Sequence, residues 1–211
     1  MGELPEACTL HPTGSPCENA MVSYLDSARR KIGLGPYKLP ADFTRLAPEM
    51  QLLILTDLDR TSYGIAPAAG VVKGLDVDAA KAVKVEDDPL ATGIPNGRIW
   101  GYAANWAGGS VNVLESYYLW MYDDGYPGTN IGCTSPSSPG CWDHRRDVLF
   151  SLHGTTTLLG IASGWSRRHT RGDAMLIVAA QLTHRVRYVY SWKQAVARGA
   201  GRNRYRPGAG H

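Results

Sequence analysis

Two apolar stretches in the C-terminal half decide the fold class: residues 155–163, TTTLLGIAS, and residues 174–182, AMLIVAAQL. Both are short and rich in Leu, Ile or Val, which is typical of buried strands. They predict a hairpin whose connection contains the Arg-Gly-Asp tripeptide of residues 171–173. That tripeptide matches a short adhesion motif, but its place in a hairpin loop requires no receptor. Further strands are predicted over 98–104 and 185–192.

Helices are predicted ahead of this hairpin. The clearest covers 48–64, where a proline in the first turn precedes a run, Leu52 to Leu55, that is apolar on all sides of the helix. Helices that precede a meander of strands indicate an antiparallel sheet covered by helices, in an α+β layered domain. The other predicted helices cover 18–32, 76–85, 111–123 with Ser110 as its N-cap, and 143–150.

The 211 residues suffice for one domain with a substantial core. We divide them into an N-terminal extension with a stapled loop and a helix (1–40), a core domain (41–192) and a basic, flexible tail (193–211). The net charge is only +3, yet seven Lys or Arg residues and no acid follow residue 173. Such asymmetry is typical of a segment that meets an anionic surface.

Four cysteines form two pairs that are close in sequence, Cys8 with Cys17 and Cys133 with Cys141. Each pair brackets a turn-rich segment, which predicts two local disulfides, and neither has the CxxC spacing of a zinc site. Disulfides favour a secreted or cell-surface protein, although residues 1–5 show no signal-peptide pattern. No apolar stretch is long enough for a transmembrane segment.

Common catalytic motifs do not occur in the chain. There is no GxSxG, no GxGxxG, no P-loop and no HExxH. The sequence therefore does not support an α/β-hydrolase serine, a nucleotide site or a zincin.

The most suggestive polar cluster joins the end of the helix predicted over 111–123 to the start of the next one. Asp123 and Asp124 follow Trp120, and His144 comes about twenty residues later. Carboxylates at a helix C-terminus are disfavoured by the helix dipole, so both need a partner. An acid beside His144 can orient its ring and raise its pKa, as in a general base.

Two other interpretations of this cluster stay open. The acids can hold a divalent cation, calcium or zinc, with Asp123 and His144 as candidate ligands beside Asn130 or loop carbonyls. Alternatively, Asp123 or Asp143 forms a structural ion pair with one of the two arginines after His144, which the residue types alone favour.

Several segments, taken in order, resemble the CAP superfamily of cysteine-rich secretory, antigen 5 and pathogenesis-related proteins, most of all a divergent, actinobacterial-like extracellular branch. The resemblance covers about residues 48–182. Residues 58–67, LDRTSYGIAP, resemble the family's N-x-x-R…G-L-x-P helix, and 105–109, NWAGG, stand where it has G-E-N-[IL]-x-x-G. The other similar segments are 120–123, WMYD, for W-x-x-E; 140–149, GCWDHRRDVL, for G-H-R-x-N-I-L; and 159–162, LGIA, for [IM]-G-V-G.

The resemblance implies a three-layer α-β-α sandwich with a small, mainly antiparallel sheet flanked by helices. Family members typically place two histidines and two acids in one cleft, where some bind divalent metal. His144 matches one histidine and Asp123 one acid. The other acid would fall at Ala104 and the other histidine at 85–87, where neither occurs, so a metal held by two histidines is excluded at this position.

We therefore expect a secreted, non-catalytic, CAP-like binding module of the cell envelope or extracellular space. Its expected partner is a lipid, a cell-wall polymer or a protein, with no specific nucleic acid, and its oligomeric state is open. The candidate binding residues are Asn105, Trp106, Trp120, Asp124 and Trp142.

Two alternatives belong to other functional classes. A hydrolase of peptide or cell-wall bonds would use Asp123 and His144 as its acid–base pair, with water or a hydroxyl such as Ser110 or Ser151 as nucleophile. A structural subunit of an extracellular or virion assembly would use the two termini as arms that grip neighbouring subunits.

Overall fold

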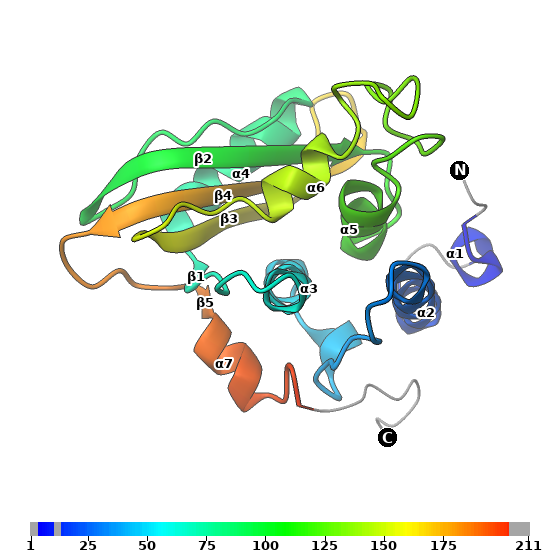
Figure 1. The fold of residues 1–211 in the computed structure, drawn as a ribbon, viewed down its shortest axis with the longest axis horizontal. Helices are drawn as coiled ribbons and strands as arrows, with labels where there is room; N and C mark the ends of the chain where they lie inside the picture. The colour runs from blue at the N-terminus through cyan, green and yellow to red at the C-terminus, as the bar shows by residue number, and fades with distance from the viewer. Residues whose placement is uncertain (1–3, 11–13, 203–211) are drawn as a thin grey trace.

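The protein is built in three layers around a five-stranded sheet (Figure 1). The computed structural model describes residues 4–10 and 14–202. One face of the sheet is covered by α4 (Lys73–Val85), and the other packs on α3 (Pro48–Ser62), α5 (Val113–Tyr122) and α6 (Asp143–Val148). This arrangement confirms the predicted α+β fold with a small sheet flanked by helices.

The sheet has the strand order β2-β4-β3-β1-β5 and is mainly antiparallel. Strands β3 (Thr156–Trp165) and β4 (Arg171–Leu182) form the predicted hairpin, and β2 (Gly97–Gly108) pairs with the outer side of β4. Strand β1 (Gly70–Val71) runs parallel to β3 and antiparallel to β5 (Tyr190–Ser191).

Two details of the sheet differ from the sequence analysis. Residues 171–173 belong to β4 and not to the hairpin connection, because their backbone pairs with both β2 and β3. The strand predicted over 185–192 is reduced to the two residues of β5, which pair only with the equally short β1.

Helix α3 is the centre of the main core. Its residues 50–60 are all buried, as the apolar run within them predicts. The guanidinium of Arg60 donates hydrogen bonds to the carbonyl oxygens of Val148 and Phe150 and to the hydroxyl of Thr157. This one side chain therefore joins α3 to the end of α6, to the segment that follows α6, and to β3.

A second buried polar group of α3 is Asp59, which the sequence does not single out. Its carboxylate is paired with Arg29 of α2 (Ser15–Lys31) and accepts hydrogen bonds from the hydroxyls of Tyr37, Tyr117 and Tyr122. These contacts satisfy a charge that would otherwise be costly to bury.

On the opposite face of the sheet, α4 lies very close to β3. A Cβ atom placed on Gly160 would overlap with the backbone and Cβ of Leu75, so only glycine allows this approach. Asp76, in the first turn of α4, accepts a hydrogen bond from the backbone N–H of Ile161 (2.9 Å). The contact therefore combines close packing with one polar anchor.

The N-terminal segment shares the main core. Helix α1 (Glu6–Leu10) is joined to α2 by the predicted Cys8–Cys17 disulfide, and α2 packs against α5. The buried residues of α2, including Met21, belong to the same apolar cluster as those of α3 and α5. The boundary predicted at residue 40 therefore does not separate two cores.

The beginning of the predicted flexible tail is instead ordered, which corrects that prediction for residues 193–202. Helix α7 (Trp192–Ala197) starts with a capping box formed by Ser191 and Gln194. Ala195 and Ala200 are buried in the main core. Residues 203–211 lie outside the described part of the chain.

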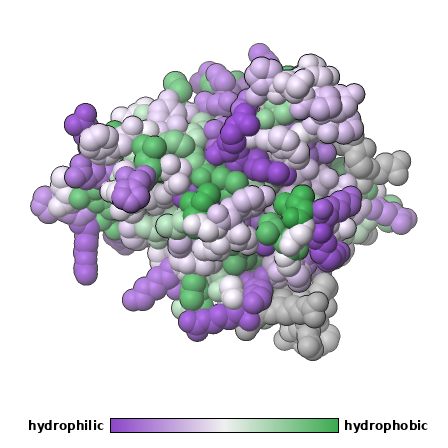
Figure 2. Space-filling view, viewed as in Figure 1, coloured by the Kyte–Doolittle hydropathy of each residue, from purple (hydrophilic) through white to green (hydrophobic). Residues whose placement is uncertain are grey.

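On the face shown in Figure 2, apolar side chains form small patches between hydrophilic ones. Elsewhere along the chain, Ile131, Trp100 and Trp165 are among the exposed large apolar side chains. Within the described residues, no helix combines the length and apolarity needed to cross a membrane.

Candidate functional site

The loop between α5 and α6 brings the end of one helix to the start of the other. The predicted Cys133–Cys141 disulfide closes the loop on itself. The side-chain amide of Asn130 donates to the carbonyl oxygens of Asp124 (3.1 Å) and Gly140 (2.7 Å). Because the two ends of the loop are tied together in this way, α6 begins beside the residue that follows α5.

Asp124 and His144 meet at this junction. Nδ1 of His144 lies 2.6 Å from Oδ1 of Asp124. The Asp124 side chain is completely buried, and it also accepts hydrogen bonds from Nδ2 of Asn130 (2.7 Å) and the backbone N–H of Arg145 (3.2 Å). Three donors fix the carboxylate, and the carboxylate in turn fixes the tautomer and orientation of the ring.

The acid beside His144 is thus Asp124, which corrects the predicted pairing of His144 with Asp123. Asp123 accepts hydrogen bonds from the backbone N–H (3.2 Å) and the hydroxyl (2.7 Å) of Thr129. The chain leaves the helical path at Asp123 (φ −116°), so the helical W-x-x-E spacing no longer specifies which side chain faces the cleft. Of the structural ion pairs that the sequence predicted, the one between Asp143 and Arg146 is present.

The surroundings of His144 favour its protonated form. The hydrogen bond that His144 donates to Asp124 raises the pKa of His144, burial opposes this shift, and the charges of Asp124, Asp88 and Asp147 raise the pKa further. Burial also raises the pKa of Asp147 to about 6 and raises that of Asp88. The imidazole therefore keeps its proton to higher pH than an ordinary histidine does, and Nε2 is the ring nitrogen that Asp124 leaves available.

His144 opens onto a cavity of about 390 Å³. The indole N–H of Trp120 donates to the carbonyl oxygen of Trp106 (3.3 Å), which links two parts of the wall. The wall is mostly apolar, with four polar side chains, and consists of Trp106, Ala107, Gly108, Leu119, Trp120, Asp124, Thr129, Asn130, Ile131 and His144.

Two of the predicted binding residues do not line this cavity. The ring of Trp142 stacks on the guanidinium of Arg145, 3.7 Å from the ring centroid, and packs over Gly125. Asn105 is fully buried and donates from Nδ2 to the carbonyl oxygen of His144 (3.1 Å). Asn105 therefore supports the start of α6, and Trp142 covers the outside of the loop.

Several residues of the site were not found from the sequence. Leu119, Thr129 and Ile131 line the cavity because of how the loop folds back, and no local pattern singles them out. The sequence could have indicated Asp147, because it lies three residues after His144 in a predicted helix, and side chains at this spacing are neighbours. Asp88 is distant in sequence, and no local pattern indicates it.

The residues expected to hold calcium or zinc do not form a site for a divalent cation. Asp123 is engaged with Thr129, while Asp124 and His144 are bonded to each other. In the described part of the chain, no three His, Cys, Asp or Glu side chains are grouped as metal ligands. The donor set thus falls short of the four or more ligands that these cations take.

Two further sequence features lie away from the cavity. Ser110 and Ser151, the suggested nucleophiles, are not part of its wall. In the Arg-Gly-Asp tripeptide, Asp173 is fully buried, is held by both terminal nitrogens of Arg171 and accepts a hydrogen bond from Ser116. The tripeptide is therefore a structural ion pair and does not present its acid to a receptor.

Comparison of the chain with protein-family models, with curated proteins and with solved structures found no match. The functional interpretation is therefore based on the geometry of the cavity and on the acid–histidine pair at its edge.

Proposed function

We propose that the protein is a secreted binding module of the CAP type, active in the cell envelope or extracellular space, and that its cavity holds a lipid-like ligand. The observation that carries this proposal is the meeting of an acid-oriented histidine with a cavity wall that includes the apolar residues Trp120, Leu119 and Ile131. A mostly apolar cavity with a few converging polar groups is the common form of a small-molecule site. Its volume of about 390 Å³ is within the range of such sites.

His144 supplies the polar contact for the ligand. Asp124 holds the Nδ1 side of the ring, so Nε2 accepts a hydrogen bond when the ring is neutral and donates one when it is protonated. A hydroxyl group can partner both forms, because it donates and accepts. The matching ligand is an amphiphile with a hydroxyl head near His144 and an apolar body against Leu119 and Trp120.

Further observations support the CAP type and an extracellular location. The resemblance assigns the cleft to positions near 85–87 and 104–105. In the structure, Asn105 donates to the backbone of His144, and the charge of Asp88 acts on its ring. The two disulfides suit an oxidising compartment outside the cytosol.

The binding proposal is tested by titrating the purified protein with dehydroergosterol, a fluorescent sterol with an uncharged hydroxyl head, and displacing it with long-chain alcohols. We expect saturable binding that Leu119→Lys abolishes, because a charge then enters the apolar wall. Trp165→Ala is the matched control, since Trp165 is exposed and does not line the cavity. The absence of saturable binding to the unmodified protein, or unchanged binding to Leu119→Lys with native circular dichroism, contradicts the proposal.

A second candidate function is favoured by one observation, the short Asp124–His144 hydrogen bond, which is the arrangement of an oriented general base. The only hydroxyl side chain in the cavity wall is that of Thr129, and it donates to Asp123. A hydrolase would therefore have to activate water directly, and we rank it below binding. Release of peptides from casein or of sugars from peptidoglycan by the protein, lost in His144→Ala, would reverse this ranking.

A further inference from the structure

A second aromatic site lies near the beginning of β2. Trp100 is 57 % exposed and forms one wall of a cavity of about 240 Å³. Trp106, which lines the His144 cavity, lies six residues further along the same strand, or about 20 Å away. The two cavities share no lining residue and are separate sites; the smaller one is lined by Trp100, Leu152, His153, Gly154, Thr155 and Gln181.

Trp100 is exposed and yet held in position. The pairing of β2 with β4 shifts between Ile99 and Gly101, so Trp100 is the unpaired residue of a bulge. Bulges in edge strands commonly re-aim a side chain. The indole N–H donates to Oε1 of Gln181 (3.3 Å), and the guanidinium carbon of Arg98 lies 5.1 Å from the ring centroid.

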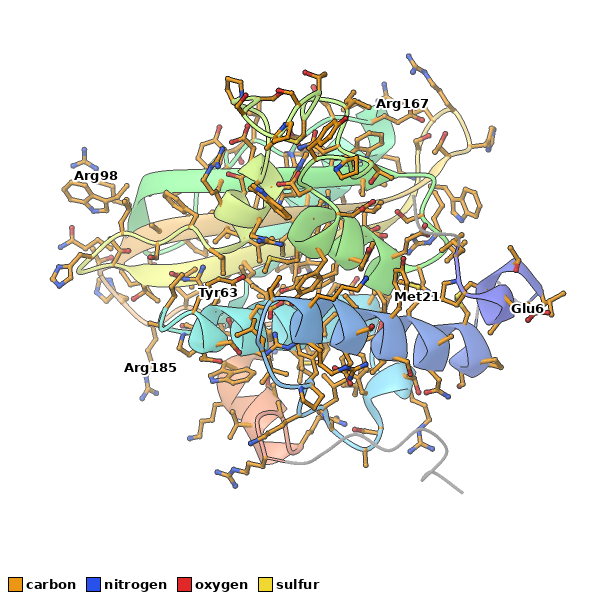
Figure 3. The ribbon with its side chains drawn as sticks, turned by 45° about the vertical axis from the view of Figure 1, so that its right-hand side comes forward. Glu6, Met21, Tyr63, Arg98, Arg167 and Arg185 are labelled. Atoms are coloured by element: carbon orange, nitrogen blue, oxygen red, sulfur yellow. A yellow bond between two sulfur atoms is a disulfide. The ribbon has the colours of Figure 1, made fainter. Side chains whose placement is uncertain are left out.

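This restraint points to a ligand. A large aromatic side chain normally gains free energy by leaving water, whereas here a hydrogen bond and a cation–π contact keep the indole at the surface. Arg98 contacts the Trp100 ring but does not line the cavity. The indole therefore contacts the guanidinium and also forms part of the cavity wall. Figure 3 shows Arg98 projecting from one end of the sheet, with Arg167 at the other.

We propose that this cavity binds a pyranose ring of a neutral oligosaccharide. One face of such a ring carries polarised C–H groups, which stack on the electron-rich face of an indole. Its hydroxyls need donors and acceptors at the edge, and the side chains of Gln181 and His153 and the backbone of Gly154 provide them. The cavity wall contains no Asp, Glu, Lys or Arg, which suits an uncharged sugar.

The size of the cavity also favours a single sugar ring. Its volume of about 240 Å³ lies below the ~300–1,000 Å³ that is typical of sites for drug-sized ligands, so it suits a small group such as one sugar ring. Only Trp100 and Leu152 contribute large apolar side chains to the cavity wall. The apolar surface of two side chains is much smaller than the ~800 Å² that each partner buries in a stable protein–protein interface. A protein partner therefore fits this site less well than a sugar.

The test is native affinity electrophoresis in gels that contain a neutral polysaccharide: mixed-linkage β-glucan, glucomannan, xyloglucan or soluble starch. We expect at least one of them to retard the protein, and Trp100→Ala to weaken this binding by tenfold or more. Trp165→Ala is a closely matched control, because Trp165 is 59 % exposed and ends β3 at the other end of the sheet. Gln181→Ala should weaken binding less, since the indole then loses its anchor and not its face.

Three results would overturn the proposal. The first is no retardation of the unmodified protein by any of the four polymers. The second is equal retardation of Trp100→Ala and Trp165→Ala, both checked for native circular dichroism. The third is a change in sedimentation of Trp100→Ala without polysaccharide, which would assign Trp100 to self-association. His144→Ala should retain full saccharide binding, so that failure of the lipid-like site and failure of this site are distinguishable.

Discussion

The substitutions Asp123→Asn and Asp124→Asn test which of these two neighbouring acids acts on His144. The structure pairs His144 with Asp124, whereas the sequence predicts Asp123 as its partner. Asp124 carries the hydrogen bond to His144, whereas Asp123 contacts Thr129. The two variants remove the same charge one residue apart. We therefore expect Asp124→Asn to lower the pKa of His144, because burial then acts on the ring without its main opposing partner. Asp123→Asn should leave that pKa almost unchanged.

The magnitude follows from the donors that Asp124 satisfies. Asparagine cannot replace the charged hydrogen bond to His144, which contributes about 1.5–3 kcal/mol, and it leaves the backbone N–H of Arg145 with a poorer acceptor at a further cost of about 1 kcal/mol. Asp124→Asn should thus lower the free energy of unfolding by about 2.5–4 kcal/mol, or the melting temperature by about 5–16 °C. Asp123→Asn should cost less than about 1 kcal/mol, because its amide oxygen can still accept from Thr129.

The difference between the variants should depend on pH. Since the folded-state pKa of His144 is raised above 6.5, its protonation stabilises the folded protein fully below that pH. This contribution disappears as the pH rises through the raised pKa. Urea unfolding at pH 5.5 and 8.5, with NMR titration of the imidazole, measures both quantities. The reasoning is refuted if Asp123→Asn, and not Asp124→Asn, lowers the pKa of His144.

Three further predictions concern the fold. Tyr117→Phe removes a hydrogen bond to the buried carboxylate of Asp59 and should cost about 1.5–3 kcal/mol in urea unfolding; a neutral result would mean that the other tyrosines suffice. Burial raises the pKa of Asp76 to about 6. The protonated Asp76 side chain therefore stabilises the folded protein fully below pH 3.8, and this contribution is lost as the pH rises through 6. Asp76→Asn should therefore gain about 1–2 kcal/mol relative to the unmodified protein between pH 4 and pH 7.5, after a discount for partial solvation, and an unchanged difference would contradict this. Gly160→Ala should cost more than about 2 kcal/mol, because its Cβ meets Leu75; a melting temperature within about 2 °C of the original would show that α4 can shift.

The sequence predicted those elements whose own residues specify them. Helix α3 has a proline in its first turn and an apolar run of four residues, and both signals are local. Strands β3 and β4 are apolar because both of their faces are covered. The capping of α5 was misassigned to Ser110, although Asn112, three residues before Glu115, caps the helix through its side chain.

Other features depend on contacts that no local pattern records. Strands β1 and β5 have two residues each and exist only because they pair with each other and with β3. The choice between Asp123 and Asp124 depends on the turn at the end of α5 and on Asn130, which draws the loop toward Asp124. A sequence pattern can place an acid near a histidine, but one residue beyond a helix it does not specify which side chain points inward.

The charges around His144 restrict which head group the proposed ligand can carry. Asp88, Asp124 and Asp147 all act on the ring, and Asp124 is completely buried. An anionic head group would gain from His144 only while the ring is protonated, and at higher pH it would face these carboxylates without compensation. A hydroxyl head group keeps one hydrogen bond with Nε2 in either state of the ring. The same electrostatics that prepare His144 to exchange a proton therefore select an uncharged amphiphile over a fatty acid or a phosphate.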